Sequence, residues 1–211
     1  MNKKLWQPDP ARISTSNLAT FIKTVESRWG VHCKNYDSLH QWSVREQEKF
    51  WTMMWDFCQI IGDGPGTRIL QDRDRMPGAC YFPEAKLNFA ENLLRQKDDS
   101  PALIFRGETG VERALTGQQL YDLVSQLIQA MTNAGIKAGD RVAGYLPNIP
   151  EAVAAMLATA SLGAVWSSCS PDFGIRGVLD RFGQIKPKLL FVADQYFYGG
   201  KSINYFDRID N

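Results

Sequence analysis

The sequence predicts an α/β protein, in which a helical N-terminal cap over residues 1–98 precedes a hairpin and a βαβαβ parallel-sheet portion over residues 99–211. In the first part, apolar residues recur at helical spacing. In the second part, three short apolar runs are centred on Val142, Val165 and Leu190, and are separated by 23 and 25 residues. Each gap has room for one helix. This spacing is typical of βαβ units, whose strands are parallel and whose crossovers are right-handed.

Composition limits the classes of function. A chain of 211 residues with 44% hydrophobic residues can fill a core. Its 24 basic and 23 acidic residues give no net-charge signature of a nucleic-acid or membrane partner. No segment approaches the roughly 18 apolar residues of a membrane span, and the first residues lack the apolar core of a secretion signal. We therefore expect a cytoplasmic protein.

The four cysteines form no Cys-x-x-Cys pair and lie far apart in the sequence, at Cys33, Cys58, Cys80 and Cys169. Such spacing fits reduced thiols in a cytosolic chain better than a disulfide set or a zinc site. We expect no metal site from it.

Two amphipathic helices are predicted in the first part of the chain. Between Ser14 and Trp29, the apolar residues fall on one helical face. A second helix is predicted to begin at Ser43, which forms a capping box with Glu46, and to end near Gly62. Five of the six tryptophans lie in this part, and aromatic residues at helical spacing indicate a packing surface. The glycine-rich residues 62–66 are interpreted as a turn, since no Gly-Lys-Ser/Thr follows them.

The second part begins with a predicted hairpin, with arms at 102–105 and 111–115 around a turn at 107–110. Thr116 and Gln119 form a capping box for a helix that Gly135 can end in the left-handed conformation. The remaining elements alternate. Strands are predicted at 140–145, 164–167 and 188–193, with helices from Pro150 to Gly163 and at 174–185.

Ligands of parallel α/β sheets bind beyond the carboxyl ends of the strands. Residues 167–173 and 194–201 both follow such ends. We therefore expect these two segments to lie side by side and to contribute to a site.

A nucleophile at Ser167, Ser168, Cys169 or Ser170 would need a base and oxyanion donors within reach. The only two histidines, His32 and His40, lie in the helical part, and no Gly-x-Ser-x-Gly is present. A hydrolase is therefore disfavoured. Ser-Pro-Asp more often forms a turn that caps the following helix.

The sequence Gly199-Gly-Lys-Ser202 shares its last letters with a P-loop, but Gln195 stands where the P-loop needs its first glycine. A Walker site is therefore disfavoured. The two glycines and Lys201 can still present backbone amides and one cation to a phosphate, although Lys201 can equally be a solvated surface lysine.

No Gly-x-Gly-x-x-Gly follows a strand, which disfavours a Rossmann dehydrogenase.

Several segments together resemble the acetoacetyl-CoA synthetase family, a branch of the AMP-forming acyl-CoA synthetases in the adenylate-forming superfamily. The most specific is Ser-Ser-Cys-Ser-Pro-Asp-Phe-Gly, which ends at Gly174. The resemblance covers most of the chain through the segments 81–83, 87–94, 139–143, 146–148, 163–174, 178–182 and 184–188.

This resemblance implies a ligase whose small-molecule substrates are acetoacetate, ATP and CoA, with Mg²⁺ accompanying ATP in the full-length enzyme. An acyl-adenylate and pyrophosphate form first, and the CoA thiol then takes the acyl group and releases AMP. Such enzymes are about three times as long as this chain. Their ATP loop and C-terminal lysine have no match here. The resemblance thus implies an amino-terminal fragment that is inactive without the missing C-terminal part of its chain. Residues 1–98 would be the cap region, and residues 99–211 the beginning of the AMP-binding domain.

The resemblance also implies CoA-binding residues, but no catalytic residue in this part. Related acetyl-CoA synthetases hold two arginines near the adenine and 3′-phosphate of CoA, and the aligned positions here are Tyr198 and Lys201, which flank Gly199 and Gly200. A Gly-Gly-Phe turn lines the pantetheine channel of those relatives, and Pro171, Asp172 and Phe173 align with it. The alternative from another class is a non-catalytic α/β interaction module that binds a partner through its Trp-rich helices.

Overall fold

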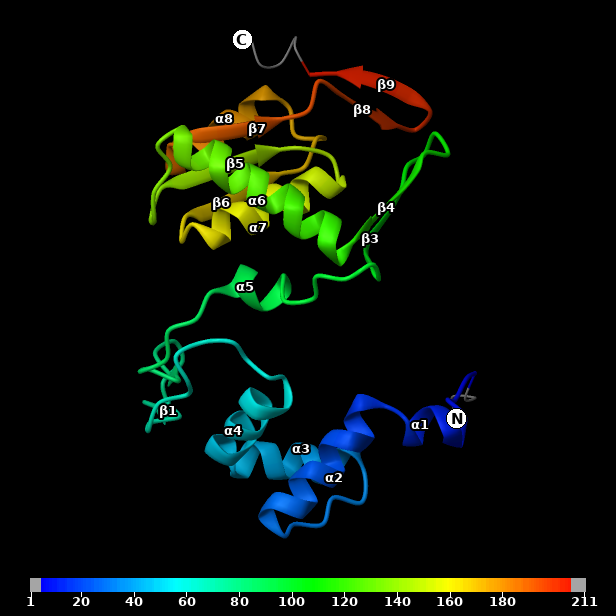
Figure 1. Ribbon diagram of the computed structural model, residues 1–211, viewed down its shortest axis with the longest axis vertical. Helices are drawn as coiled ribbons and strands as arrows, with labels where there is room; N and C mark the ends of the chain where they lie inside the picture. The colour runs from blue at the N-terminus through cyan, green and yellow to red at the C-terminus, as the bar shows by residue number, and fades with distance from the viewer. Residues whose placement is uncertain (1–4, 206–211) are drawn as a thin grey trace. The chain divides into compact units, whose positions relative to one another are not determined.

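The computed structural model describes residues 5–205 and divides into two compact units, Met1–Lys86 and Leu87–Asn211 (Figure 1). This division lies twelve residues before the boundary at 98/99 that the change in sequence texture suggests. The helix Phe89–Leu93 belongs to the second unit, where its Ala90 joins the core. The assignment of the two parts as cap region and AMP-binding domain stays a prediction.

The first unit is helical, with two short paired strands. Its core contains Phe21, Val25, Trp42 and Met53, with Trp29 packed against them. The tryptophan and phenylalanine residues of this unit thus serve largely as packing residues, as their spacing predicted. The elements are α1 (Pro10–Ser14), α2 (Asn17–Trp29), α3 (Tyr36–Arg45), α4 (Gln47–Phe57), β1 (Leu70–Gln71) and β2 (Cys80–Tyr81).

The predicted capping box at Ser43 and Glu46 is wrong. A reciprocal pair of hydrogen bonds between Asn35 and Ser38 instead caps α3, with the N-cap Asn35 eight residues before Ser43. Ser43 therefore lies inside α3, where its hydroxyl donates to the carbonyl of His40 at 2.8 Å. Glu46 is the break between α3 and α4, and α4 ends at Phe57 rather than at Gly62. The first predicted helix is confirmed as α2, which ends at Trp29 as predicted but begins at Asn17, because Ser16 caps it and a separate short helix, α1, ends at Ser14.

The second unit contains the predicted hairpin and parallel sheet. Strands β3 and β4 are antiparallel, and the capping box of Thr116 and Gln119 at the start of α6 is confirmed. Gly135, with φ 78°, follows the end of α6. The elements are α5 (Phe89–Leu93), β3 (Pro101–Arg106), β4 (Glu112–Thr116), α6 (Gly117–Asn133), β5 (Arg141–Tyr145), α7 (Pro150–Ser161), β6 (Val165–Cys169), α8 (Ile175–Ile185), β7 (Leu189–Val192), β8 (Gln195–Tyr198) and β9 (Lys201–Asn204).

The three parallel strands have the order β6-β5-β7, so β5 is central. Successive residues of a strand point to opposite faces. Val142 of β5 accordingly packs in the cluster that contains α6 and α7, whereas Ala143 and Tyr145 pack with Phe182 of α8. Helices α6 and α7 thus cover one face of the sheet and α8 covers the other (Figure 1). The predicted parallel βαβαβ arrangement is confirmed.

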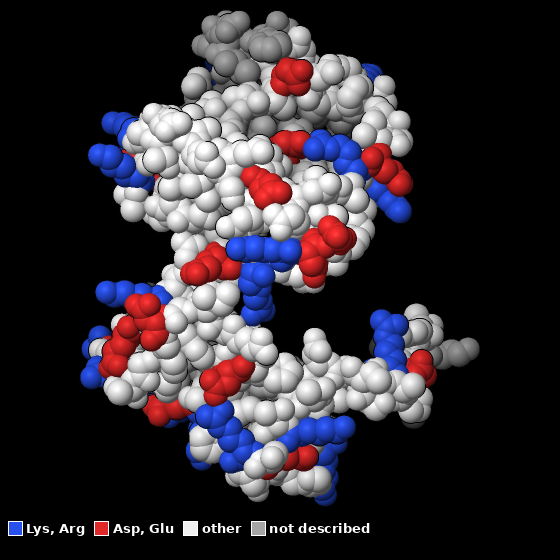
Figure 2. Space-filling view, viewed as in Figure 1, with Lys and Arg blue, Asp and Glu red and all other residues white. Residues whose placement is uncertain are grey.

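Charged residues of both signs are mixed on the face of the molecule that Figure 2 shows. On the face shown in Figure 2, Lys and Arg side chains alternate with Asp and Glu, in keeping with a formal net charge of +1. The arrangement on this face offers no extended region of one sign for a polyanion.

Candidate functional site

The topology of the sheet creates a crevice between β5 and β6. Helix α7, which follows β5, and helix α8, which follows β6, lie on opposite faces, so the two connecting loops diverge. Such a switch point at the carboxyl ends of parallel strands is the usual ligand position in open α/β sheets. A cavity of about 440 Å³ lies there, lined by the β5–α7 loop, the end of β6 and one side of α7.

Trp166 forms part of the wall of this crevice, and its position depends on Gly144. A Cβ atom at Gly144 would lie 2.6 Å from the Cη2 and Cζ2 atoms of Trp166. Glycine at this point of β5 therefore lets the indole lie across the backbone of the neighbouring strand. Leu146 and Met156 add apolar surface, and Ser168 adds a hydroxyl.

Cys169 also lines this cavity and is 5% exposed. Burial raises the pKa of its thiol, an effect that the positive charge of Arg181 partly opposes. At neutral pH, Cys169 is therefore protonated and is a poor nucleophile. The two histidines belong to the Met1–Lys86 unit. The burial and the raised pKa of Cys169 support the prediction that the serine- and cysteine-containing loop has no covalent catalytic role.

The next residues form a turn. The amide of Phe173 donates to the carbonyl of Ser170 at 3.2 Å, with Pro171 and Asp172 between them. The hydroxyl of Ser170 donates to a carboxylate oxygen of Asp172 at 3.2 Å. Asp172 is exposed, whereas Phe173 is half-buried and its ring centroid lies 3.9 Å from the guanidinium carbon of Arg181. The turn predicted from Ser-Pro-Asp is thus present directly before α8, but its side chains do not cap that helix, whose N-cap is Gly174.

The other predicted site residues lie in a hairpin that the sequence reasoning missed. Strands β8 and β9 pair in antiparallel fashion, with Tyr198 opposite Lys201. The two-residue turn between them consists of Gly199 and Gly200, whose φ angles are 58° and 76°. Two positive φ angles are the requirement of a type I′ turn, which favours glycine. The Gly-Gly pair, which directly follows the aromatic residues 196–198, was the available signal for this hairpin.

Tyr198, at 61% exposure, and Lys201 both lie at the surface beside the turn. The amide of Gly200 points toward a carboxylate oxygen of Glu108, at 3.5 Å. Glu108 belongs to the turn between β3 and β4. A negative side chain thus lies near the amides that sequence reasoning assigned to a phosphate, and this charge opposes anion binding at Gly200.

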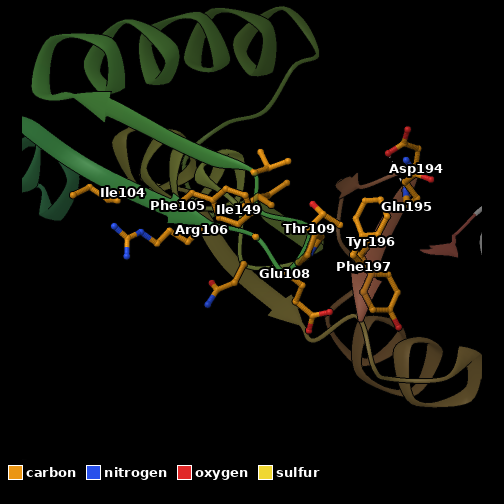
Figure 3. A pocket seen from close by; sticks show the side chains of 14 residues that line it. Ile104, Phe105, Arg106, Glu108, Thr109, Ile149, Asp194, Gln195, Tyr196 and Phe197 are labelled. Atoms are coloured by element: carbon orange, nitrogen blue, oxygen red, sulfur yellow. Dashed lines mark hydrogen bonds between the residues drawn. The ribbon is translucent and has the colours of Figure 1, made fainter. Parts of the chain in front are cut away.

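A cavity of about 620 Å³ lies between this hairpin and the β3–β4 hairpin (Figure 3). Glu108 and Thr109 line it from the β3–β4 turn, and Tyr196 and Phe197 line it from β8. Asn148, from the β5–α7 loop, lines both this cavity and the crevice beside β6. The β5–α7 loop therefore lies between the two.

The predicted site residues consequently form two groups and not one. Residues 167–173 and 194–201 do not lie directly side by side, because β7 pairs with β5 and not with β6. The hairpin group contains Tyr198, Gly199, Gly200 and Lys201, and the turn group contains Asp172 and Phe173. Sequence reasoning missed Tyr145, which ends the strand between the groups and contacts the turn through its hydroxyl.

Within residues 5–205, no cluster of three or more His, Cys, Asp or Glu side chains is arranged to hold a metal ion. Among the helices of the same part of the chain, none has both the length and the apolar character that a bilayer crossing needs.

Comparison with known proteins identifies the class to which this sheet and crevice belong. A family model described as AMP-binding enzyme matches residues 89–208, and one described as acetyl-coenzyme A synthetase N-terminus matches residues 36–93. The chain belongs to the AMP-binding enzyme family. The whole of the AMP-binding match lies within its second unit.

Among individual relatives, the chain is similar to acetoacetyl-coenzyme A synthetase of Rhizobium meliloti, with 55% identity over 94% of this chain and 30% of that protein. It is 39% identical to acetoacetyl-CoA synthetase of Gallus gallus, over 97% of this chain and 31% of that protein. It is 36% identical to a malonamoyl-CoA synthetase of Penicillium aethiopicum, over 93% of this chain and 28% of that protein.

A solved structure of acetoacetyl-CoA synthetase from Streptomyces lividans matches 99% of this chain and 33% of its own, with a TM-score of 0.92 and 43% identity. The chain thus spans about a third of the length of the proteins that it matches. The expected α/β fold and the resemblance to the acetoacetyl-CoA synthetase family are both confirmed.

Proposed function

We propose that the chain is the amino-terminal part of an AMP-forming ligase that converts acetoacetate, ATP and CoA to acetoacetyl-CoA, AMP and pyrophosphate. The observation that supports this most directly is the 55% identity to an acetoacetyl-coenzyme A synthetase over 94% of the chain. In this proposal, Mg²⁺ accompanies ATP, and the ATP loop and the adenylation lysine belong to the remainder of the enzyme.

Acetoacetate is the preferred acyl substrate of the proposal, and malonamate is its nearest competitor. The malonamoyl-CoA synthetase relative is 36% identical, which is close to the 39% of the vertebrate acetoacetyl-CoA synthetases. Both carboxylates carry a carbonyl group two carbons from the carboxyl carbon. The higher identity to the bacterial acetoacetyl-coenzyme A synthetase favours acetoacetate.

For the chain itself, we propose a contribution to CoA binding. Lys201 would bind the 3′-phosphate, Tyr198 would contact the adenine, and Gly199 and Gly200 would present amides. Their exposure and their place at the tip of one hairpin support this role. The turn with Asp172 and Phe173 would line the path of the pantetheine.

The activity is tested with the full-length protein, ATP and either acetoacetate or malonamate, by measuring pyrophosphate release. We expect release with acetoacetate, and AMP rather than ADP as the nucleotide product once CoA is added. The 211-residue chain alone should release none above background. Pyrophosphate release by the chain alone would contradict its assignment as a fragment. Absence of release from the full-length protein would favour the interaction-module alternative.

The CoA contact is tested with Lys201→Ala. A charge-assisted hydrogen bond to a phosphate contributes about 1.5 to 3 kcal/mol, and about 1.4 kcal/mol corresponds to a factor of ten. The KM for CoA should therefore rise roughly tenfold to a hundredfold. The maximal rate should change much less, because this contact is remote from the reacting sulfur. Pyrophosphate exchange without CoA should not change.

Two controls accompany this variant. Lys137→Ala removes another exposed lysine, in the loop between α6 and β5, and should leave the KM for CoA unchanged. Dephospho-CoA lacks the 3′-phosphate, so wild type should bind it less tightly than CoA, and Lys201→Ala should hardly distinguish the two. An equal preference for the 3′-phosphate in wild type and variant would show that Lys201 is an ordinary surface lysine.

A further inference from the structure

Tyr145, the last residue of β5, contacts the turn that precedes α8. It is 3% exposed, and its hydroxyl donates to the carbonyl of Phe173 at 2.7 Å. The carbonyl of Pro171 lies 3.2 Å from the same hydroxyl. A hydroxyl has one proton to donate, and the shorter contact, to Phe173, is the better hydrogen bond. The central strand of the sheet is thus hydrogen-bonded to the backbone of this turn.

This contact differs from the bonds within the turn. The bond from Phe173 N to Ser170 O and the bonds between Ser170 and Asp172 join residues of the turn to each other. They close the turn, but they do not fix its position on the sheet. The hydroxyl of Tyr145 attaches the turn to β5, whose backbone is paired on both sides.

The ring of Phe173 is held separately by α8. The guanidinium carbon of Arg181 lies 3.9 Å from its centroid, which is within cation–π distance. A Cβ atom at Gly177 would lie 3.2 Å from Cδ1 of Phe173, so the ring packs closely on the first turn of α8. Loss of the Tyr145 hydroxyl would therefore release the backbone of the turn while α8 still held the ring.

On its other side, Tyr145 connects to the hairpin that contains Lys201. The ring centroid of Tyr145 lies 4.6 Å from that of Tyr205, which lies 5.1 Å from that of Tyr196 in β8. All three rings are buried. Tyr196 pairs with Ile203 across the hairpin. The ring of Tyr145 thus belongs to the packing that supports the hairpin, and its hydroxyl belongs to the turn.

We propose that Tyr145 is a positioning residue for CoA, whose hydroxyl sets the backbone of the Pro171–Phe173 turn relative to the β8–β9 hairpin. This inference rests on the proposed function, in which both segments contact CoA. It predicts that the hydroxyl and the ring of Tyr145 have different roles. The hydroxyl affects the pantetheine path, whereas the ring maintains the packing beneath the hairpin.

The test is Tyr145→Phe in the full-length protein, because phenylalanine keeps the ring and removes only the hydroxyl. A neutral hydrogen bond contributes about 0.5 to 1.5 kcal/mol. The kcat/KM for CoA should therefore fall about twofold to tenfold. Pyrophosphate exchange without CoA should not change, because the turn is assigned to the CoA step. Tyr121→Phe, which removes a hydroxyl on α6, should alter neither rate.

A second measurement does not depend on activity. Cys169 directly precedes the turn and is 5% exposed, so its alkylation by iodoacetamide reports on release of the turn. In Tyr145→Phe, labelling of Cys169 should be at least about threefold faster, as followed by peptide mass spectrometry. Cys33 is buried to the same extent in the other unit and serves as the internal reference.

The outcomes separate this inference from the proposed function. Unchanged labelling of Cys169 would overturn the claim that the hydroxyl fixes the turn. Faster labelling with unchanged CoA kinetics would overturn the role of the turn in CoA binding, and with it the positioning role. If the wild-type protein showed no CoA-dependent reaction, the proposed function would fail, and the labelling would still decide whether Tyr145 fixes the turn.

Discussion

The serine- and cysteine-containing loop after β6 can be tested for covalent chemistry by Cys169→Ala. The thiol is 5% exposed, its pKa is raised by burial, and it lines the crevice at the end of the sheet. Cys33 offers a matched control, because it is also 5% exposed and burial also raises the pKa of its thiol, with Glu26 adding to the effect. It lies in the helical unit and is not one of the residues that line this crevice.

The expected loss of stability in the alanine variants follows from packing. Replacing a small buried thiol with alanine removes one polarizable atom and typically costs on the order of 1 kcal/mol of stability. Both variants should therefore show a similar, small loss of stability. Both should keep a substantial fraction of the proposed ligase activity of the full-length protein, because the folded state is still present in excess at this cost.

The raised pKa adds a pH dependence. The pKa of this thiol is higher in the folded state than in the unfolded state, where it is ordinarily 9.0. The thiol's contribution to stability is therefore fully present below the unfolded-state pKa. It is lost as pH rises through the folded-state pKa. Wild type should therefore lose stability more steeply above about pH 9 than either alanine variant. Urea unfolding at a series of pH values measures this slope.

Activity is assayed as acetoacetate-dependent formation of acetoacetyl-CoA by the full-length protein, with circular dichroism to verify the fold. A fall beyond about a thousandfold in Cys169→Ala would refute the packing role, provided that the fold is intact and Cys33→Ala is active. Such a loss would mean that the thiol takes part in the chemistry, and that its buried, protonated state changes during turnover.

Two further predictions concern charged residues. Glu108→Gln should lower the KM for CoA up to about fivefold, because it removes an exposed negative charge near Gly200 that contributes at most about 1 kcal/mol. An unchanged KM would indicate that no phosphate approaches Gly200. The pKa of Asp140 is held low by a hydrogen bond from Lys188 and then by the amide of Lys137, so its contribution to stability is present above the unfolded pKa and lost as pH falls through the folded-state pKa. Asp140→Asn should therefore be less stable than wild type near neutral pH, as measured by urea unfolding. The difference should narrow as pH falls below the ordinary carboxyl pKa of 3.8, and a difference that does not narrow in acid would contradict this assignment.

Local sequence patterns predicted the start of a helix correctly where only one capping box was possible. Thr116 and Gln119 form the capping box that their spacing predicts, and α6 follows from it. Ser43 and Glu46 have the same spacing but form no cap, because Asn35 and Ser38 begin a helix upstream that already includes Ser43. The spacing of capping residues alone does not show which of two possible helix starts the structure uses.

The arrangement of the site depended on contacts distant in sequence. The strands were predicted, but not their order, and the order decides that the segments after β6 and β7 lie on either side of β5. Tyr145 had no recognisable motif, since its partner Phe173 is 28 residues away. The β8–β9 hairpin is a different case, because Gly199 and Gly200 were a local signal that the resemblance to a phosphate loop obscured.

The short strand β5 explains how two different environments arise at one end of this sheet. Its side chains alternate between the faces, so Val142 points toward α6 and α7, and Ala143 and Tyr145 point toward α8. Gly144 has no side chain, and Trp166 fills that space beside the crevice. Tyr145, one residue later, extends on the opposite face to the turn and the buried tyrosines. Adjacent residues of one strand therefore shape the crevice on one face and hold the turn on the other, which makes the end of β5 the structural link between the two groups of proposed CoA contacts.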